Sequence, residues 1–163
     1  SVAGISRRSK IRLRWYGIEP GNLTLEEKRK IGTVSDKWTI ELDNPDQLIP
    51  RDRYALQSLL RRNTVESFVR ISPVYQPTLE VSYNRSYMVF NSGMRMTIDR
   101  DIKYRKLWPN SSQMFRRSPV DCVLEFKYSI TQKTEFGHLL RSFPYRVFRH
   151  SKYVVGIDSV AVG

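Results

Sequence analysis

The chain has 163 residues, 40% of them hydrophobic and 12% aromatic, and this composition excludes a disordered chain because it supplies enough apolar surface for a folded core. Cys122 is the single cysteine, so a disulfide framework within the chain is excluded as well. Lys and Arg number 28 against 16 Asp and Glu, a formal net charge of +12. The expected partners are therefore anionic: phosphate-rich ligands, nucleic acid or an anionic membrane.

The first predicted element is a β-hairpin. Residues 8–17 alternate polar and apolar side chains with the period of two that is typical of a strand. A turn at Glu19-Pro20-Gly21-Asn22 leads into a second strand over roughly 23–32. We expect the two strands to pair antiparallel.

A helical insert is predicted next, over about 35–72. Ser35-Asp36-Lys37-Trp38 offers a helix cap, and the apolar spacing from Asp52 to Arg62 favours an amphipathic helix. A second short helix is predicted over Val65 to Arg70 before prolines end the insert.

The second half of the chain predicts another hairpin, a strand, a helix and a strand-like tail. Asn91-Ser92-Gly93 is the hairpin turn, Pro144 ends the helix, and Gly156 interrupts the tail. The expected bounds are 79–90 and 94–105 for the hairpin, 121–129 for the strand, 131–143 for the helix and 145–162 for the tail.

Charged side chains recur on one face of the predicted strands, and apolar side chains occupy the other. The stretches with this pattern are 10–15, 24–28, 79–85, 94–99 and 122–128. We therefore expect an α+β fold built on an antiparallel β-barrel with a charged interior and helices packed outside, as a single domain over residues 1–163.

Several short strings, in this order along the chain, resemble the VTC domain, the polyphosphate polymerase branch of the triphosphate tunnel metalloenzymes. The strings are Lys10-Ile11-Arg12-Leu13-Arg14-Trp15-Tyr16-Gly17, Leu25-Glu26-Glu27-Lys28, Val81-Ser82-Tyr83-Asn84-Arg85, Met94-Arg95-Met96-Thr97-Ile98-Asp99-Arg100, Val123-Leu124-Glu125-Phe126-Lys127-Tyr128 and Phe148-Arg149-His150-Ser151-Lys152-Tyr153. The resemblance implies a closed tunnel of antiparallel strands in which cations grip a chain of phosphates. It also implies a further N-terminal part, so we expect this chain to be incomplete at its N-terminus.

The resemblance assigns roles to individual residues. The phosphate-gripping cations that carry catalysis are Arg12, Arg14, Lys28, Arg85, Arg95 and Lys152. Further substrate contacts are expected from Lys10, Lys127, Arg149, Ser151 and Tyr153. Glu125 is the expected ligand of Mn²⁺ or Mg²⁺, and Glu26 is a second candidate.

The function implied by this resemblance is a metal-dependent phosphotransferase, a polyphosphate polymerase that moves the γ-phosphate of ATP onto a polyphosphate chain. Its partners are then ATP, polyphosphate and inorganic phosphate or pyrophosphate. Two alternatives stay open: a triphosphatase or nucleoside triphosphate hydrolase of the same fold, and a non-catalytic polyphosphate-binding module. For Glu125 an internal ion pair with Lys127 also stays open.

Nucleic acid is not an expected partner. A nucleic-acid binder needs aromatic rings between cations on the same face. Here Trp15, Phe126 and Tyr128 fall on the face opposite Arg14 and Lys127.

The expected location is cytoplasmic. The lone cysteine favours a reducing compartment, and no apolar run approaches the ~20 residues of a membrane helix. Contact with a membrane is expected only through a partner or a segment outside this chain.

Overall fold

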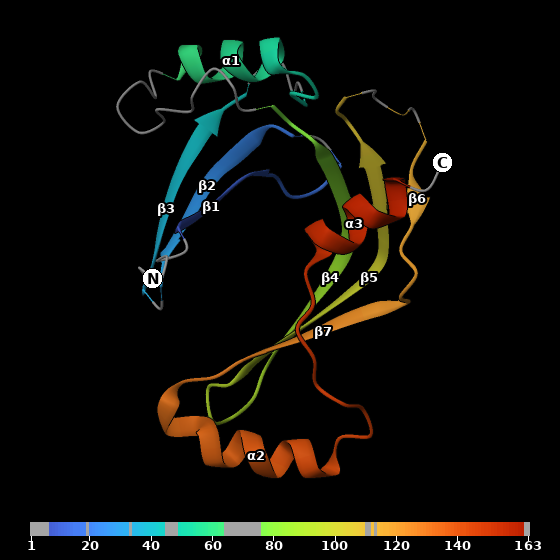
Figure 1. Cartoon of the computed structure of the whole chain (residues 1–163). Coiled ribbons are helices and arrows are strands. Elements are labelled where there is room, and N and C mark those ends of the chain that lie inside the picture. Colours follow the sequence, from blue (N-terminus) through green and yellow to red (C-terminus); the bar gives the residue numbers. More distant parts are fainter. Residues whose placement is uncertain are drawn as a thin grey trace, which may run out of the picture. The chain divides into compact units, whose positions relative to one another are not determined.

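The alternating stretches of the sequence form two antiparallel sheets in a computed structural model of the chain (Figure 1). The structure describes residues 7–18, 20–32, 34–44, 49–63, 76–109, 112 and 114–161, without the side chains of Arg7 and Arg8. The chain divides into two units, Ser1–Pro77 and Thr78–Gly163. Each unit has its own sheet and is described by itself.

In its described residues, the first unit contains a three-stranded sheet in the order β1-β2-β3 and one helix. The elements are β1 (Arg7–Arg14), β2 (Asn22–Ile31), β3 (Val34–Asp43) and α1 (Arg53–Arg62). Residues opposite one another across the strands share a face of the sheet. Arg12, Glu26 and Thr39 are aligned in this way, and so are Leu13, Leu25 and Ile40. The sheet therefore has a charged face and an apolar face.

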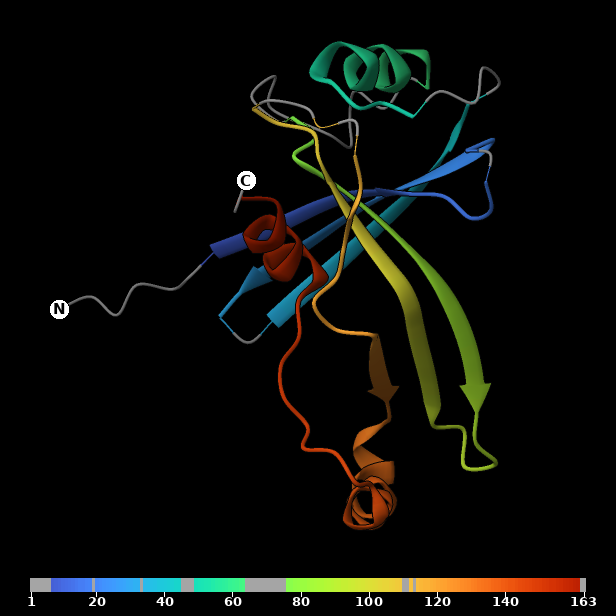
Figure 2. The same cartoon turned by 90° about the vertical axis from the view of Figure 1, so that its right-hand side faces the viewer.

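Helix α1 packs on the apolar face, near the start of β2 and the end of β3 (Figures 1 and 2). The helix begins at a capping residue, because the side chain of Asp52 accepts a hydrogen bond of 2.8 Å from the backbone N–H of Ala55. The core consists of Leu23, Leu25 and Leu42 from the sheet and Leu56, Leu59 and Leu60 from the helix. Removing each such side chain from water stabilises the fold by roughly 1.5–3 kcal/mol.

The second unit contains a four-stranded sheet in which β5 is the inner strand. The strands are β4 (Leu79–Val89), β5 (Arg95–Lys106), β6 (Arg116–Arg117) and β7 (Cys122–Lys127). β5 pairs with β4 along one edge and with β6 and β7 along the other. The helices of this unit are a 3-10 turn η2 (Ile130–Gln132), α2 (Lys133–Ser142) and α3 (Lys152–Ala161).

A β-bulge in β5 changes which residues share a face. The register shifts between Ser82 and Asn84, and Asp101 on β5 has a φ of 53°. The side chain of Asn84 donates a hydrogen bond of 2.9 Å to the carboxylate of Asp101. Because β5 gains one residue over β4 here, Tyr104 comes to the same face as Asp99 although the two are an odd number of residues apart.

The two helices of the second unit pack on opposite faces of its sheet, toward opposite ends (Figure 2). Phe136 of α2 contacts the rings of Phe126 and Tyr128, at centroid distances of 5.5 and 4.1 Å. Helix α3 lies on the other face, where Gly156 is pressed against Tyr104. The face that carries Asp99 is therefore partly covered by α3.

The prediction of a β-barrel with a charged interior is wrong. Neither of the two described sheets closes on itself, because β1 and β3 each pair with one neighbour, as do β4, β6 and β7. Alternation along a strand assigns side chains to faces, but it does not determine which edge strands pair. The charged residues instead occupy one face of each open sheet.

Both predicted hairpins are confirmed, as are the helix at α1, the strand at β7 and the helix at α2. The start of the helical insert is wrong, since Val34–Asp43 is the strand β3. The strand-like tail is wrong as well, because Lys152–Ala161 is the helix α3. Glu19 of the first turn and the short helix over residues 65–70 lie outside the described residues.

Candidate functional site

A row of lysines crosses the charged face of the first sheet. Lys10, Lys28 and Lys37 are aligned on neighbouring strands, with all three exposed. Side chains aligned in this way have Cβ atoms about 5 Å apart, and like charges so placed repel one another. Lys10 and Lys28 have no ion-pair partner among the residues that the structure describes. An anion placed over the row would relieve this repulsion.

Next to this row lies Glu26, which is paired with three cations, one of them Lys37 of the row. Its carboxylate lies 2.5 Å from Nε of Arg12, 2.8 Å from Nη2 of Arg14 and 3.1 Å from Nζ of Lys37. Glu26 is only 3% exposed. Burial raises the pKa of Glu26, but hydrogen bonds from Arg12 and Lys37 outweigh burial, so the pKa lies below its ordinary value. Glu26 is therefore a buried carboxylate that stays ionised.

The prediction of Glu26 as a metal ligand does not fit this geometry. Its carboxylate oxygens already face three positive charges within 3.1 Å. A divalent cation at the same carboxylate would be repelled by all three. Glu26 instead acts as the counter-ion of Arg12, Arg14 and Lys37.

Lys37 was missed by the sequence reasoning, although its stretch carried a signal. Trp38, Ile40 and Leu42 alternate with polar residues, which is the pattern of a strand. Because Ser35-Asp36 was interpreted as the cap of a helix, this strand was not predicted.

In the second sheet, Asp99 is a buried carboxylate paired with cations, as Glu26 is in the first sheet. Its carboxylate accepts hydrogen bonds of 2.6 and 2.7 Å from Nε and Nη2 of Arg85, and it lies 2.5 Å from Nζ of Lys152. Asp99 is fully buried, at 0% exposure. The ring of Tyr83 lies against both cations, 5.1 Å from the guanidinium carbon of Arg85 and 5.2 Å from Nζ of Lys152. Two of the predicted phosphate-binding cations are thus held together by an acid that the sequence reasoning did not single out.

The charges of Asp99 and Arg85 stabilise each other, as the direction of both pKa shifts shows. Burial raises the pKa of Asp99, but hydrogen bonds from Arg85 and Lys152 outweigh burial and hold that pKa below its usual range. The bond to Asp99 likewise raises the pKa of Arg85 above its ordinary value, against the effect of burial. Asp99 and Arg85 are therefore both charged at neutral pH.

Ser151, Lys152 and Tyr153 form the beginning of α3. The backbone C=O of Ser151 accepts a hydrogen bond of 3.0 Å from the N–H of Val155, so Ser151 caps the helix and Lys152 is its first residue. The hydroxyl of Tyr153 lies 3.4 Å from that of Thr78. Arg149 is exposed just before the helix and has no hydrogen bond or ion pair to another described residue. The N-terminal end of a helix favours anions, which suits a phosphate ligand.

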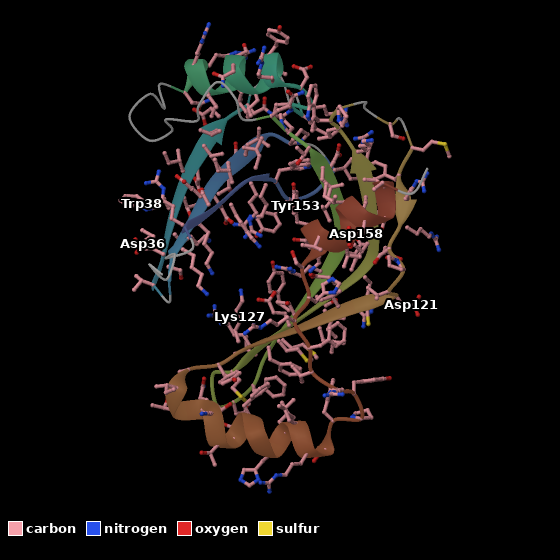
Figure 3. The ribbon with its side chains drawn as sticks, viewed as in Figure 1. Asp36, Trp38, Asp121, Lys127, Tyr153 and Asp158 are labelled. Carbon is pink, nitrogen blue, oxygen red and sulfur yellow. The ribbon has the colours of Figure 1, made fainter. Side chains whose placement is uncertain are left out.

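Glu125, Lys127 and Arg95 lie on the same face as Asp99. Lys127 is aligned with Arg95, and Glu125 is aligned with Thr97. Lys127 points away from the side of β7 that α2 covers (Figure 3). Its Nζ is 3.6 Å from a carboxylate oxygen of Glu125, and both side chains are about half exposed. The ion pair is loose, so the carboxylate of Glu125 is accessible.

Glu125 fits the chemistry of a Mg²⁺ or Mn²⁺ site of the kind completed by substrate. Mg²⁺ is commonly held by one or two carboxylates together with substrate phosphates and water. The described residues contain no group of three or more His, Cys, Asp or Glu that could form an all-protein cage. Glu125 would therefore hold such an ion together with substrate phosphates and water.

The predicted site residues are divided between the two units. The structure brings Arg12 and Arg14 together at Glu26, aligns Lys10 with Lys28, joins Arg85 to Lys152 and aligns Arg95 with Lys127. Each of these groups belongs to one unit.

The stability of the protein is expected to fall as the pH drops below about 4.5. Asp99 and Glu26 have folded-state pKa values below their ordinary values of 3.8 and 4.5. Their stabilising effect is complete above those ordinary values and is lost as the pH falls through the folded-state values. Urea unfolding across this range measures the effect. The decline should be shallower in Asp99→Asn, and an unchanged slope in that variant would contradict the assignment.

A family model described as the VTC domain matches residues 1–161. A search of curated proteins gave no match, and a search of solved structures gave none. In the described part of the chain, no helix has the length and apolar character needed to cross a membrane. The match spans essentially the whole sequence and includes both cationic faces, so the chain belongs to the VTC domain family.

Proposed function

We propose that this protein is a phosphotransferase that binds polyphosphate and lengthens it with the γ-phosphate of ATP. The VTC family is linked to polyphosphate. The observation that carries the proposal is the lysine row of Lys10, Lys28 and Lys37 beside Arg12 and Arg14, the two arginines that Glu26 holds. This surface has more positive than negative charge and a spacing of about 5 Å between aligned side chains. A chain with one negative charge per phosphate would match it.

Arginine and lysine have different tasks in such a surface. The guanidinium group is planar and always charged, so Arg12, Arg14 and Arg85 suit fixed contacts to phosphate oxygens. The ammonium groups of Lys10 and Lys28 are flexible point charges, which suits a polymer that must slide as it grows. Phosphoryl transfer needs mainly positioning and charge neutralisation from the protein. These residues provide both.

The proposed reaction is a displacement at the γ-phosphorus of ATP, with ADP as the leaving group. An oxygen of the terminal phosphate of the chain attacks the γ-phosphorus of ATP, a new P–O bond forms, and the bond to the β-phosphate oxygen breaks to release ADP. Bound at Glu125, Mn²⁺ or Mg²⁺ would neutralise charge on the phosphates. Arg95 and Lys127, aligned beside Glu125, would hold the phosphates near that carboxylate.

A non-catalytic polyphosphate-binding module is the second candidate. One observation favours it: Glu26 is fully engaged by three cations, so of the two proposed metal ligands Glu125 alone keeps an accessible carboxylate. Under this alternative the cationic faces bind polyphosphate without turnover.

The test is incubation of the protein with ATP labelled at the γ-phosphate and Mn²⁺, with polyphosphate resolved on a gel and ADP and free phosphate measured alongside. We expect labelled polymer and one ADP for each phosphate added. Glu125→Gln should lower the rate about 100-fold or more, because the metal contact is worth several kcal/mol in the transition state. Glu135→Gln is the matched control, since it makes the same change at an exposed carboxylate of α2, and it should leave the rate unchanged.

The other outcomes identify the other functions. ADP and free phosphate without polymer would mean hydrolysis. Binding of tripolyphosphate without release of ADP would mean a binding module. Failure to bind tripolyphosphate at all would overturn the proposal.

A further inference from the structure

Each sheet contains one buried carboxylate in its inner strand, on its cationic face. Glu26 lies in β2, which has β1 and β3 on either side, and Asp99 lies in β5, which has β4 on one side and β7 on the other. They are 3% and 0% exposed. Both are surrounded by cations that come from other elements of the same unit. The same arrangement thus occurs in two separate segments of the chain.

The contacts of Asp99 fix its two cations without using all their donors. Arg85 donates from Nε and Nη2 to Asp99 and makes a further hydrogen bond to Tyr87, so part of its five N–H donors remains for another acceptor. Lys152 has three donors and makes one ion pair with Asp99. The side chains of Arg85 and Lys152 are still 20% and 19% exposed. Both can therefore meet a phosphate while Asp99 holds them.

Glu26 acts in the same way on the first sheet. One of its oxygens faces Nε of Arg12, and the other faces Arg14 and Lys37. Arg12 and Lys37 are more than half exposed, at 61% and 53% of their side chains. These long side chains would otherwise sample many rotamers, and binding would have to immobilise them.

We propose that Asp99 and Glu26 are positioning residues for polyphosphate: each holds its cations in the binding-competent arrangement, while the cations themselves contact the phosphates. This inference rests on the proposed function for the identity of the anion. The expected change in anion affinity is opposite to the change that net charge alone would cause. Replacing either acid by its amide makes the surface more positive, which alone would strengthen the binding of an anion. Loss of positioning weakens it.

The experiment measures the dissociation constant of tripolyphosphate by calorimetry at one fixed ionic strength, for the full chain and for Asp99→Asn and Glu26→Gln. We expect the dissociation constant to rise about tenfold in each variant, because two or three side chains must then be ordered on binding. Thermal unfolding of each variant shows that it is folded at the temperature of the measurement. Should Asp99→Asn not fold, Glu26→Gln carries the test, since its partners are the more exposed.

Glu80→Gln is the matched control. Glu80 joins Arg105 in a largely buried pair between the same strands, β4 and β5, with a hydrogen bond of 3.1 Å from Nε of Arg105. Its neighbour Val81 is aligned with Tyr104 on the face of Asp99, so Glu80 lies on the other face. The control makes the same change of charge and also removes a buried ion pair. It should lower the melting temperature and leave the dissociation constant unchanged.

A double-mutant cycle separates positioning from a merely structural role. If Asp99 acts through Arg85, then Asp99→Asn should have little further effect on affinity in an Arg85→Lys background, because lysine lacks the paired N–H groups that Asp99 fixes. If the two substitutions lower the affinity additively, Asp99 does not act through Arg85. Unchanged or tighter binding by folded Asp99→Asn and Glu26→Gln would overturn the inference while leaving the proposed function intact. Absence of binding by the parent chain would overturn both.

Discussion

Gly156→Ala is expected to lower the free energy of unfolding by about 2 kcal/mol, although alanine is the better helix former. A Cβ at this position would lie 2.6 Å from Cδ2 of Leu79 and 2.6 Å from Cδ1 of Tyr104. The ring of Tyr104 is completely buried and cannot turn aside. Helix α3 would have to move away from the sheet. Urea unfolding monitored by circular dichroism measures the loss.

Gly137→Ala is the control for this effect. Gly137 lies within α2, and a Cβ there would meet no atom within 4 Å. This variant should be more stable than the parent by about 0.5–1 kcal/mol, because alanine restricts the unfolded chain and favours the helix. Equal stability of the two alanine variants would show that α3 does not pack on Tyr104 as described. Movement of α3 would also displace Lys152, so Gly156→Ala should bind tripolyphosphate more weakly.

The second large effect is expected from Arg85→Met, which should destabilise the protein by about 3 kcal/mol. Breaking a buried ion pair by removing one partner typically costs about 3–5 kcal/mol, and Lys152 remains as a partner of Asp99, which favours the lower end. Asp99 has no exposure to water that could compensate. Arg100→Met is the control, because Arg100 lies exposed on the same pair of strands and makes one long hydrogen bond of 3.5 Å to Ser86. Its effect should stay within about 0.5 kcal/mol.

Two further measurements check the cause of this loss. The difference between Arg85→Met and the parent should shrink as the pH falls through the folded-state pKa of Asp99, because a protonated carboxyl no longer needs a cation. Replacing Asp99 by leucine in the Arg85→Met background should restore part of the stability, since an apolar pair leaves no buried charge. A loss that persists at low pH and is not restored would mean that Arg85 stabilises the sheet by packing alone.

The face assignments of the cations followed from local sequence, and the structure explains why. In a strand the side chains alternate strictly, so Arg12 and Arg14 must share a face opposite Leu13 whatever the rest of the chain does. The same rule separates Lys127 from Phe126. Turn residues fixed the two hairpins for an equally local reason.

The errors came from segments in which tertiary contacts decide the conformation. Tyr153, Val154 and Val155 favour a strand by propensity. They form a helix, and Gly156 in its middle allows the close approach to Tyr104 that packs this helix on the sheet. Asp99 was passed over because its role depends on Lys152, a residue far along the chain. Nothing local distinguishes it from an ordinary polar position in a strand.

What the sequence by itself determined is the two hairpins and the strand β7, the faces on which their cations lie and the family to which the chain belongs, because period-two alternation and short motifs are local properties. Only the tertiary structure decided that the sheets are open, that Glu26 gathers cations from β1 and β3, and that Asp99 joins Arg85 to Lys152. These features depend on which strands pair and which helix packs where. Both are set by contacts between distant residues, which alternation along one strand does not encode.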